Sequence, residues 1–279
     1  IKMIKEPTFK SRDERLEWIY AHKNDLISMK KMQVKHADAC GGFLILPENN
    51  EIIKGIDGVR PFNSFKSGQI GVSAVINTTN ILDSHGDVHL DNLWNKSLKE
   101  TKFVYLNNNH KRDFENIISN KVEAYVVNTT FKALGYNFEG TTQALVFNAI
   151  IDEKSPYDND KKTPLYDAYK SGNINNHSVE MRYKDILLGI NDKRYPENKE
   201  IFDTYIKYAK NITPDMYDEI DDVWFVKQAQ VMGGAAVPHG SNAYTPTLEV
   251  EQSQDIQNSE KGIHQEQPFD IEKFKNLLF

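Results

Sequence analysis

Residues 177–186 read His-Ser-Val-Glu-Met-Arg-Tyr-Lys-Asp-Ile, and this stretch decides the fold. Apolar and polar side chains alternate from Val179 to Tyr183, which is the period of two that is typical of a β-strand. Side chains at every second position share one face of a strand, so Ser178, Glu180 and Arg182 are expected to project together. A strand of this kind in the middle of the chain indicates a protein built mainly from sheet.

The rest of the chain adds further strands and a few helices. Strands are predicted at 69–77, 103–106, 122–127, 143–151 and 223–231. Helices are predicted at 11–38, where Ser11 and Glu14 form a capping-box pattern, and at 92–101, 164–171 and within 190–222. Many strands between a few helices predict an α+β, mainly β, fold with a closed or strongly curved sheet and helices packed around it.

Three regions follow from this pattern. Residues 1–68 are expected to form an N-terminal helical and irregular extension, and 69–248 a β-rich domain with a helical insertion near 190–222. Residues 249–279 shift to glutamine, glutamate, serine and asparagine, which is typical of a flexible polar linker, and end in a short apolar-polar helix.

Composition excludes several classes of protein. The 279 residues carry 34 basic and 40 acidic side chains, a net charge of -6, so nucleic acid is not an expected partner. No apolar run approaches the ~20 residues that span a bilayer, and the first residues lack the apolar core of a signal peptide. Cys40 is the single cysteine, which rules out an internal disulfide and fits a reducing, cytoplasmic setting.

His110 and Ser178 are the candidate catalytic pair, each on a predicted strand segment. A serine hydroxyl becomes a nucleophile when a neutral imidazole takes its proton, and a third group usually orients that imidazole. Glu180 is the candidate for the third role, and Arg182 could lie near a developing oxyanion. The alternative is that Glu180 and Arg182 form an ion pair on an exposed strand face.

A metal site is a second possibility. His85, Asp87 and His89 would share one face of an extended segment and could hold a divalent cation. Residues 83–86, Asp-Ser-His-Gly, have the composition of a turn, which would break that geometry. No resident metal or other cofactor is therefore expected.

Two further patterns are weaker indications of a catalytic or binding site. Cys40 and His36 could act as a thiol nucleophile and its base, but no strand-turn context supports them. Residues 233–236, Gly-Gly-Ala-Ala, lack the Gly-Lys-Ser/Thr ending of a phosphate-binding loop, so small side chains are expected there for close backbone packing.

Four segments together resemble the prohead (capsid maturation) proteases of tailed bacteriophages, distant relatives of the herpesvirus assemblins. The family pattern has an Asp-x-x-Gly-Asp-Val segment, an Asn-His at a strand end, a His-Ser-Val strand and a final turn with Gly-x-Asn-x-x-Thr. The chain matches it in order, over roughly residues 70–250, at Asp83–Val88, Asn109–His110, His177–Tyr183 and Val237–Thr245.

The resemblance implies an assemblin-like closed β-barrel flanked by helices, and a serine endopeptidase with Ser178 as nucleophile and His110 as general base. Such enzymes cut a scaffold or the major capsid protein precursor inside the immature shell, and they commonly cleave themselves. It therefore implies a location in the host cytoplasm inside the assembling prohead, self-association, retention in the virion, and cleavage in the polar segment after residue 249.

The chain departs from the family pattern at two places. Position 180 is often glycine in relatives with the His-Ser-Val motif, and the later strand often carries Glu-x-Ser where this chain has Gly-Gly-Ala at 233–235. These departures motivate a rival interpretation, in which the chain is a catalytically inactive, protease-like scaffold or assembly protein of the virion.

Overall fold

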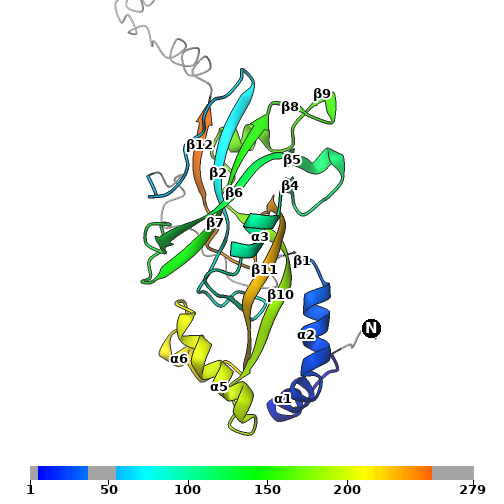
Figure 1. Ribbon diagram of the computed structural model, residues 1–279, viewed down its shortest axis with the longest axis vertical. Helices are drawn as coiled ribbons and strands as arrows, with labels where there is room; N and C mark the ends of the chain where they lie inside the picture. Colours follow the sequence, from blue (N-terminus) through cyan, green and yellow to red (C-terminus); the bar gives the residue numbers. More distant parts are fainter. Residues whose placement is uncertain (1–5, 37–54, 253–279) are drawn as a thin grey trace, which may run out of the picture.

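The computed structural model describes residues 6–36 and 55–252, which form two packed sheets, a third sheet of two short strands, and helices at the periphery (Figure 1). The described helices are α1 (Arg12–Ala21), α2 (Lys23–Met32), α3 (Asn95–Glu100), α4 (Tyr166–Lys170), α5 (Pro196–Tyr205) and α6 (Pro214–Tyr217). The strands are β1 (Lys35–His36), β2 (Gln69–Thr78), β3 (Asp87–His89), β4 (Leu106–Asn108), β5 (Ile117–Ser119), β6 (Lys121–Thr130), β7 (Thr141–Asp152), β8 (Lys154–Ser155), β9 (Asp158–Lys162), β10 (His177–Ile190), β11 (Asp222–Ala236) and β12 (Thr247–Gln252). No described helix has the length and apolar character that crossing a membrane requires.

A long antiparallel hairpin of β10 and β11 forms the centre of the larger sheet (Figure 1). Its register runs from His177 opposite Ala236 to Ile190 opposite Asp222. The order of this sheet is β1-β10-β11-β4-β5, with β3 also paired to β11. Strand β4 runs parallel to β11, so the chain that leaves β4 emerges beside the start of β10.

The smaller sheet, in the order β12-β2-β7-β6, packs on the larger one. Val179, Met181 and Tyr183 of β10 belong to the same buried apolar cluster as Ile76 and Phe147 of the smaller sheet. Side chains of β10 therefore point alternately into this core and away from it, as its period predicts. The face that points away carries Ser178 and Glu180.

The closed barrel that the family resemblance implies is wrong for this chain. Both larger sheets are open: the ordered strands end at β1 and β5 in one and at β12 and β6 in the other. Closure requires the two edge strands of one sheet to pair, and here the sheets instead bury their apolar faces against each other. The coarser prediction of an α+β, mainly β, fold is confirmed.

Most predicted strands are present, with altered ends. β2, β6, β7, β10 and β11 confirm the strands predicted at 69–77, 122–127, 143–151, 177–186 and 223–231. The strand predicted at 103–106 begins only at Leu106, and Phe103 and Tyr105 are exposed. Thr247–Gln252 forms β12, so the segment after residue 249 continues as strand for a few residues. The predicted linker and helix beyond it, and Cys40, lie outside the described residues.

The predicted helices are also found, though the first is divided. His22 separates α1 from α2, and α2 ends at Met32. Ser11 caps α1 as expected, because its hydroxyl accepts a hydrogen bond from the Glu14 amide. Helices α5 and α6 confirm the helical insertion within 190–222, and they lie at the far end of the β10–β11 hairpin (Figure 1).

The N-terminal helices are attached to the larger sheet beside β10 (Figure 1). After α2 the chain turns into β1, which pairs antiparallel with β10 so that Lys35 lies opposite Met181 and His36 opposite Glu180. The N-terminal segment is therefore hydrogen-bonded to the strand that carries Ser178.

Candidate active site

Ser178 is the second residue of β10, on the face that points away from the core between the sheets. Across the hairpin it lies opposite Ala235. Only 1% of its surface is exposed. The strand pairs with β11 at this position, and the backbone of the preceding residue, His177, bonds to the Thr245 hydroxyl.

His110 reaches Ser178 from the turn after β4. Asn109 and His110 both have positive φ, 53° and 58°, a conformation that is uncommon for residues other than glycine. Backbone hydrogen bonds hold the turn: the Asn109 amide donates to the Ala236 carbonyl (2.9 Å) and the Lys111 amide to the Asn108 carbonyl (3.1 Å). Two consecutive left-handed residues at a candidate base are the kind of local strain that clusters at functional sites.

Ser178, His110 and Glu180 form one hydrogen-bonded chain. The Oγ of Ser178 lies 2.8 Å from Nε2 of His110, and Nδ1 of His110 lies 3.1 Å from Oε1 of Glu180. A carboxylate only accepts hydrogen bonds, so Nδ1 carries the proton and Nε2 presents its lone pair to the serine hydroxyl. The structure thus brings together all three residues that the sequence singled out, in the arrangement of a nucleophile, a base and an orienting acid.

Glu180 is buried but fully partnered. Its Oε1 also accepts a hydrogen bond from Nδ2 of Asn107 (2.9 Å), and its Oε2 accepts from Nε of Arg112 (3.0 Å), whose terminal nitrogen lies 2.8 Å away. Burial alone would raise the pKa of Glu180, but the bonds from His110 and Asn107 and the charge and bonds of Arg112 together lower its pKa below its usual value. The carboxylate therefore stays ionised beside His110.

Small residues on β11 make room for these side chains. Gly233 lies opposite Glu180, and a Cβ there would approach the Tyr105 carbonyl (3.1 Å) and Oε2 of Glu180 (3.4 Å). On the other face, a Cβ on Gly234 would press on Ile76 and Phe147 across the core. Residues 233–236 thus belong to a strand that needs close packing, as expected, and not to a phosphate-binding loop.

Two cavities are lined by residues on or next to the strands that carry the catalytic chain. One, of about 310 Å³, is lined by Glu180, Arg112, Asn107, Tyr105, Phe114, Ile117 and Met232. Met232 is the extra residue of a β-bulge opposite Glu180 and Met181, which turns it toward this cavity. The other, of about 280 Å³, lies near the first residue of β10 and is lined by Asn108, Leu165, Asn173, Ile174, Asn175, Asn176, Ala236, Val237 and Pro238.

His177, the residue before the nucleophile, has a structural role. Its Nδ1 lies 3.0 Å from the Thr245 carbonyl and its Nε2 lies 3.0 Å from the Tyr169 hydroxyl. The Thr245 hydroxyl in turn donates to the His177 carbonyl (2.8 Å). The segment with the Gly-x-Asn-x-x-Thr pattern thus holds the start of β10, and its Thr245 does not enter the catalytic chain.

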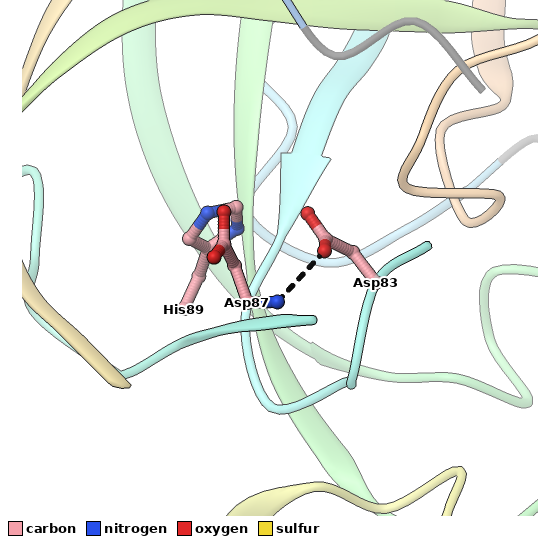
Figure 2. Close-up of side chains that lie close together, drawn as sticks. All are labelled: Asp83, Asp87 and His89. Carbon is pink, nitrogen blue, oxygen red and sulfur yellow. Dashed lines mark hydrogen bonds between the residues drawn. The ribbon is translucent and has the colours of Figure 1, made fainter. Parts of the chain in front are cut away.

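Asp83, Asp87 and His89 form a second polar cluster away from Ser178, at β3 and the turn before it (Figure 2). Their ligand atoms lie within 4.8 Å of one another, so Asp83 takes the place that the sequence gave to His85. Oδ1 of Asp83 accepts from the amides of His85 (2.8 Å) and Asp87 (2.9 Å), which confirms the predicted turn at 83–86.

Protein groups already satisfy this cluster. Asp87 accepts hydrogen bonds from Lys30 (2.6 Å), Lys35 and the Tyr183 hydroxyl (2.7 Å). Nδ1 of His89 lies 2.9 Å from the Asn77 amide nitrogen, and its Nε2 lies 2.9 Å from the Tyr183 hydroxyl. Two ammonium groups supply the positive charge that a metal would bring, so the cluster fits a buried structural network better than a metal centre.

Arg182 does not lie near Ser178, where the sequence pattern placed it beside a developing oxyanion. Four residues along a strand separate its Cα from that of Ser178 by about 13 Å. Its Nε is buried without a hydrogen-bond partner among the described residues. Glu180 is itself buried, so the alternative of an exposed Glu180–Arg182 pair is wrong; the ion pair that forms instead uses Arg112.

Sequence reasoning missed Asn107 and Arg112, which bond to the same carboxylate. Both lie within three residues of His110 in the sequence, and that proximity was the available indication.

No protein-family model, curated protein or solved structure matches the chain.

Proposed function

We propose that this chain is a serine endopeptidase in which Ser178 is the nucleophile and His110 is the general base. Glu180 orients the imidazole of His110 and stabilises its protonated form. The observation that carries the proposal is the continuous chain of hydrogen bonds from Oγ of Ser178 through both ring nitrogens of His110 to Glu180. The family resemblance narrows the proposed substrate to a scaffold or capsid protein precursor of a phage head, and to the chain itself.

The chemistry would proceed by acyl transfer. Oγ of Ser178 attacks the scissile carbonyl carbon while Nε2 of His110 takes the hydroxyl proton, and Glu180 stabilises the imidazolium that forms. The imidazolium then protonates the leaving amine as the C–N bond breaks. Water, deprotonated by the same imidazole, attacks the acyl-enzyme and releases the acid and Ser178.

A second candidate is a protease-like assembly protein without turnover. The observation that favours it is the 1% exposure of Ser178, since a peptide bond reaches the hydroxyl only after neighbouring groups move. The two candidates differ in whether the hydroxyl is activated and accessible in solution.

The test is covalent labelling of the full chain by a fluorophosphonate probe, with Ser178→Ala as the paired variant. We expect labelling of the native chain at Ser178 and none in Ser178→Ala, because only a hydroxyl deprotonated by a base attacks phosphorus at a useful rate. Ser73→Ala is the control, since Ser73 is a buried strand serine bonded to Asn148 and remote from His110.

The same pair of proteins tests proteolysis. Intact-mass measurement over time should show cleavage of a co-incubated capsid precursor, or of the chain itself, by the native protein only. Equal labelling and equal cleavage with Ser178→Ala would eliminate the proposal, and absence of both in the native protein would favour the assembly role.

A further inference from the structure

Arg112 lies two residues after the candidate base and reaches over to the carboxylate of Glu180. Its Nε donates to Oε2 at 3.0 Å and its terminal nitrogen lies 2.8 Å from the same oxygen. Asn107 and His110 occupy the other oxygen, Oε1. Each carboxylate oxygen therefore has its own set of donors.

We infer that Arg112 is a positioning residue for the proposed hydrolysis: it holds the Glu180 carboxylate so that Oε1 stays directed at Nδ1 of His110. The inference rests on the proposed function, and it adds a residue to which neither the sequence pattern nor the family resemblance assigns a role.

The geometry gives the reason. A glutamate side chain has three rotatable bonds, and its terminal torsion is broad. Without Arg112, Oε2 would lose two donors in a nearly buried site, and the carboxylate could rotate to share its oxygens differently between Asn107 and His110. A misplaced Oε1 would leave the imidazole free to tilt away from Ser178, and small misplacements of this kind are costly in rate.

Charge and donor geometry are separable contributions of Arg112. The guanidinium is a permanent cation with a planar fork of donors, whereas a lysine offers a cation without the paired donors. Arg112→Lys therefore separates the charge from the positioning. A residue with only a folding role would change the amount of folded protein and leave the rate per folded molecule unchanged.

The Arg112 side chain is also partly exposed to solvent. It is 46% exposed and lines the 310 Å³ cavity with Tyr105 and Phe114. A substitution there can change substrate affinity as well as rate, so the test needs a reaction with little demand on binding. A small fluorophosphonate, which carries no peptide, meets that requirement.

The experiment measures the second-order labelling rate of the full chain by the fluorophosphonate from pH 5 to 9. We expect Arg112→Gln and Arg112→Ala to lower the labelling rate per folded molecule about 10- to 100-fold, because the carboxylate is less well held. Arg112→Lys, which keeps the charge but not the paired donors, should also lose rate.

Two controls isolate the positioning role. Methylguanidinium added to Arg112→Ala should restore part of the rate, since it can occupy the vacated position beside Oε2. Arg60→Gln should label at the native rate, because Arg60 pairs with the exposed Glu123 on another strand.

The outcomes are distinguishable. If Arg112→Gln and Arg112→Ala label at the native rate, while Ser178→Ala is unlabelled, the role of Arg112 is overturned and the proposed function stands. The role also falls if rate loss only tracks the fraction unfolded in urea and methylguanidinium restores nothing. A native chain that is unlabelled overturns both.

Discussion

Ser178 and Glu180 project from the same face of one strand, so a single element supplies both groups that bond to His110. Their relative position is set by the two-residue period of the strand and needs no long-range agreement between separate elements. Only the imidazole has to be brought in from elsewhere, and the turn after β4 does that.

Glu180→Gln tests this arrangement at the smallest scale. The amide can donate to Nδ1, which favours the tautomer with the proton on Nε2, and that tautomer cannot accept the proton of Ser178. We expect kcat for peptide or ester hydrolysis, measured per folded molecule, to fall roughly 10³- to 10⁴-fold.

Glu123→Gln is the matched control, since Glu123 is an exposed strand glutamate paired with Arg60. Retention of more than half of native kcat by Glu180→Gln would show that the carboxylate is not needed for tautomer selection.

Glu180 could be predicted from the sequence because strand alternation is a local rule. Asn107 and Arg112 could not, because their placement depends on β4 pairing in parallel with β11, on the side of β11 opposite to β10. That pairing joins residues more than 120 positions apart in the chain, and no local pattern encodes it.

At the scale of elements, the N-terminal segment is anchored by charge. Lys30 of α2 and Lys35 of β1 both bond to Asp87, whose carboxylate is fully buried on β3. Tyr183 of β10 donates to the same carboxylate. One buried anion thus connects the helices at the start of the chain to two strands of the sheet.

Asp87→Asn should destabilise the fold by about 3–5 kcal/mol, because it removes the carboxylate that bonds to both partly buried lysines and leaves Lys35 with Asp83 at 4.0 Å. A double-mutant cycle with Lys35→Met, read from urea unfolding, should give a coupling energy of about 1–3 kcal/mol.

The exposed pair Arg60–Glu123 is the reference, and its cycle should give less than about 1 kcal/mol. A coupling energy for Asp87 and Lys35 no larger than this reference would mean that hydrogen bonding within the sheet, and not the ion pair, holds the N-terminal segment.

Long strands were predicted well because their side-chain period is repeated many times. The short strands β3, β4 and β5 have three residues each, too few for a period, and they exist because β11 or β4 offers a partner. Phe103 and Tyr105 illustrate the error: an apolar run predicted a strand there, but both side chains are exposed, and Tyr105 lines the cavity.

For the molecule as a whole, the strand content could be predicted from the sequence, but whether a sheet closes into a barrel could not. Whether edge strands meet depends on register, twist and the packing of one sheet on another. Here β12 pairs with β2 and completes the smaller sheet, while apolar faces meet in the core between the two sheets. The strand pattern predicted either a closed or a strongly curved sheet, and the choice of a closed barrel came from the family resemblance.

Two buried histidines should make the fold sensitive to mild acid. Burial lowers the pKa of both His89 and His177 to about 4. An unfolded histidine titrates near 6.5, so between that pH and about 4 the unfolded chain binds more protons than the folded one. Stability is therefore fully present above pH 6.5 and lost as pH falls toward 4, by up to roughly 3 kcal/mol for each histidine.

Urea midpoints measured from pH 7.5 to 4.5 check this slope. His177→Gln should be less stable at neutral pH, since His177 bonds to Thr245 and Tyr169, but its stability should fall less steeply below pH 6.5. Equal slopes in the two proteins would mean that His177 is protonated in the folded state.

The length of the β10–β11 hairpin separates two ends of the molecule. Ser178 lies at one end, and the loop that carries α5 and α6 lies at the other, about 40 Å away along a strand of this length. Asp218 and Glu219, directly after α6, are exposed. An affinity tag or fluorophore inserted there would give a handle for immobilising or imaging the protein that leaves its chemistry undisturbed.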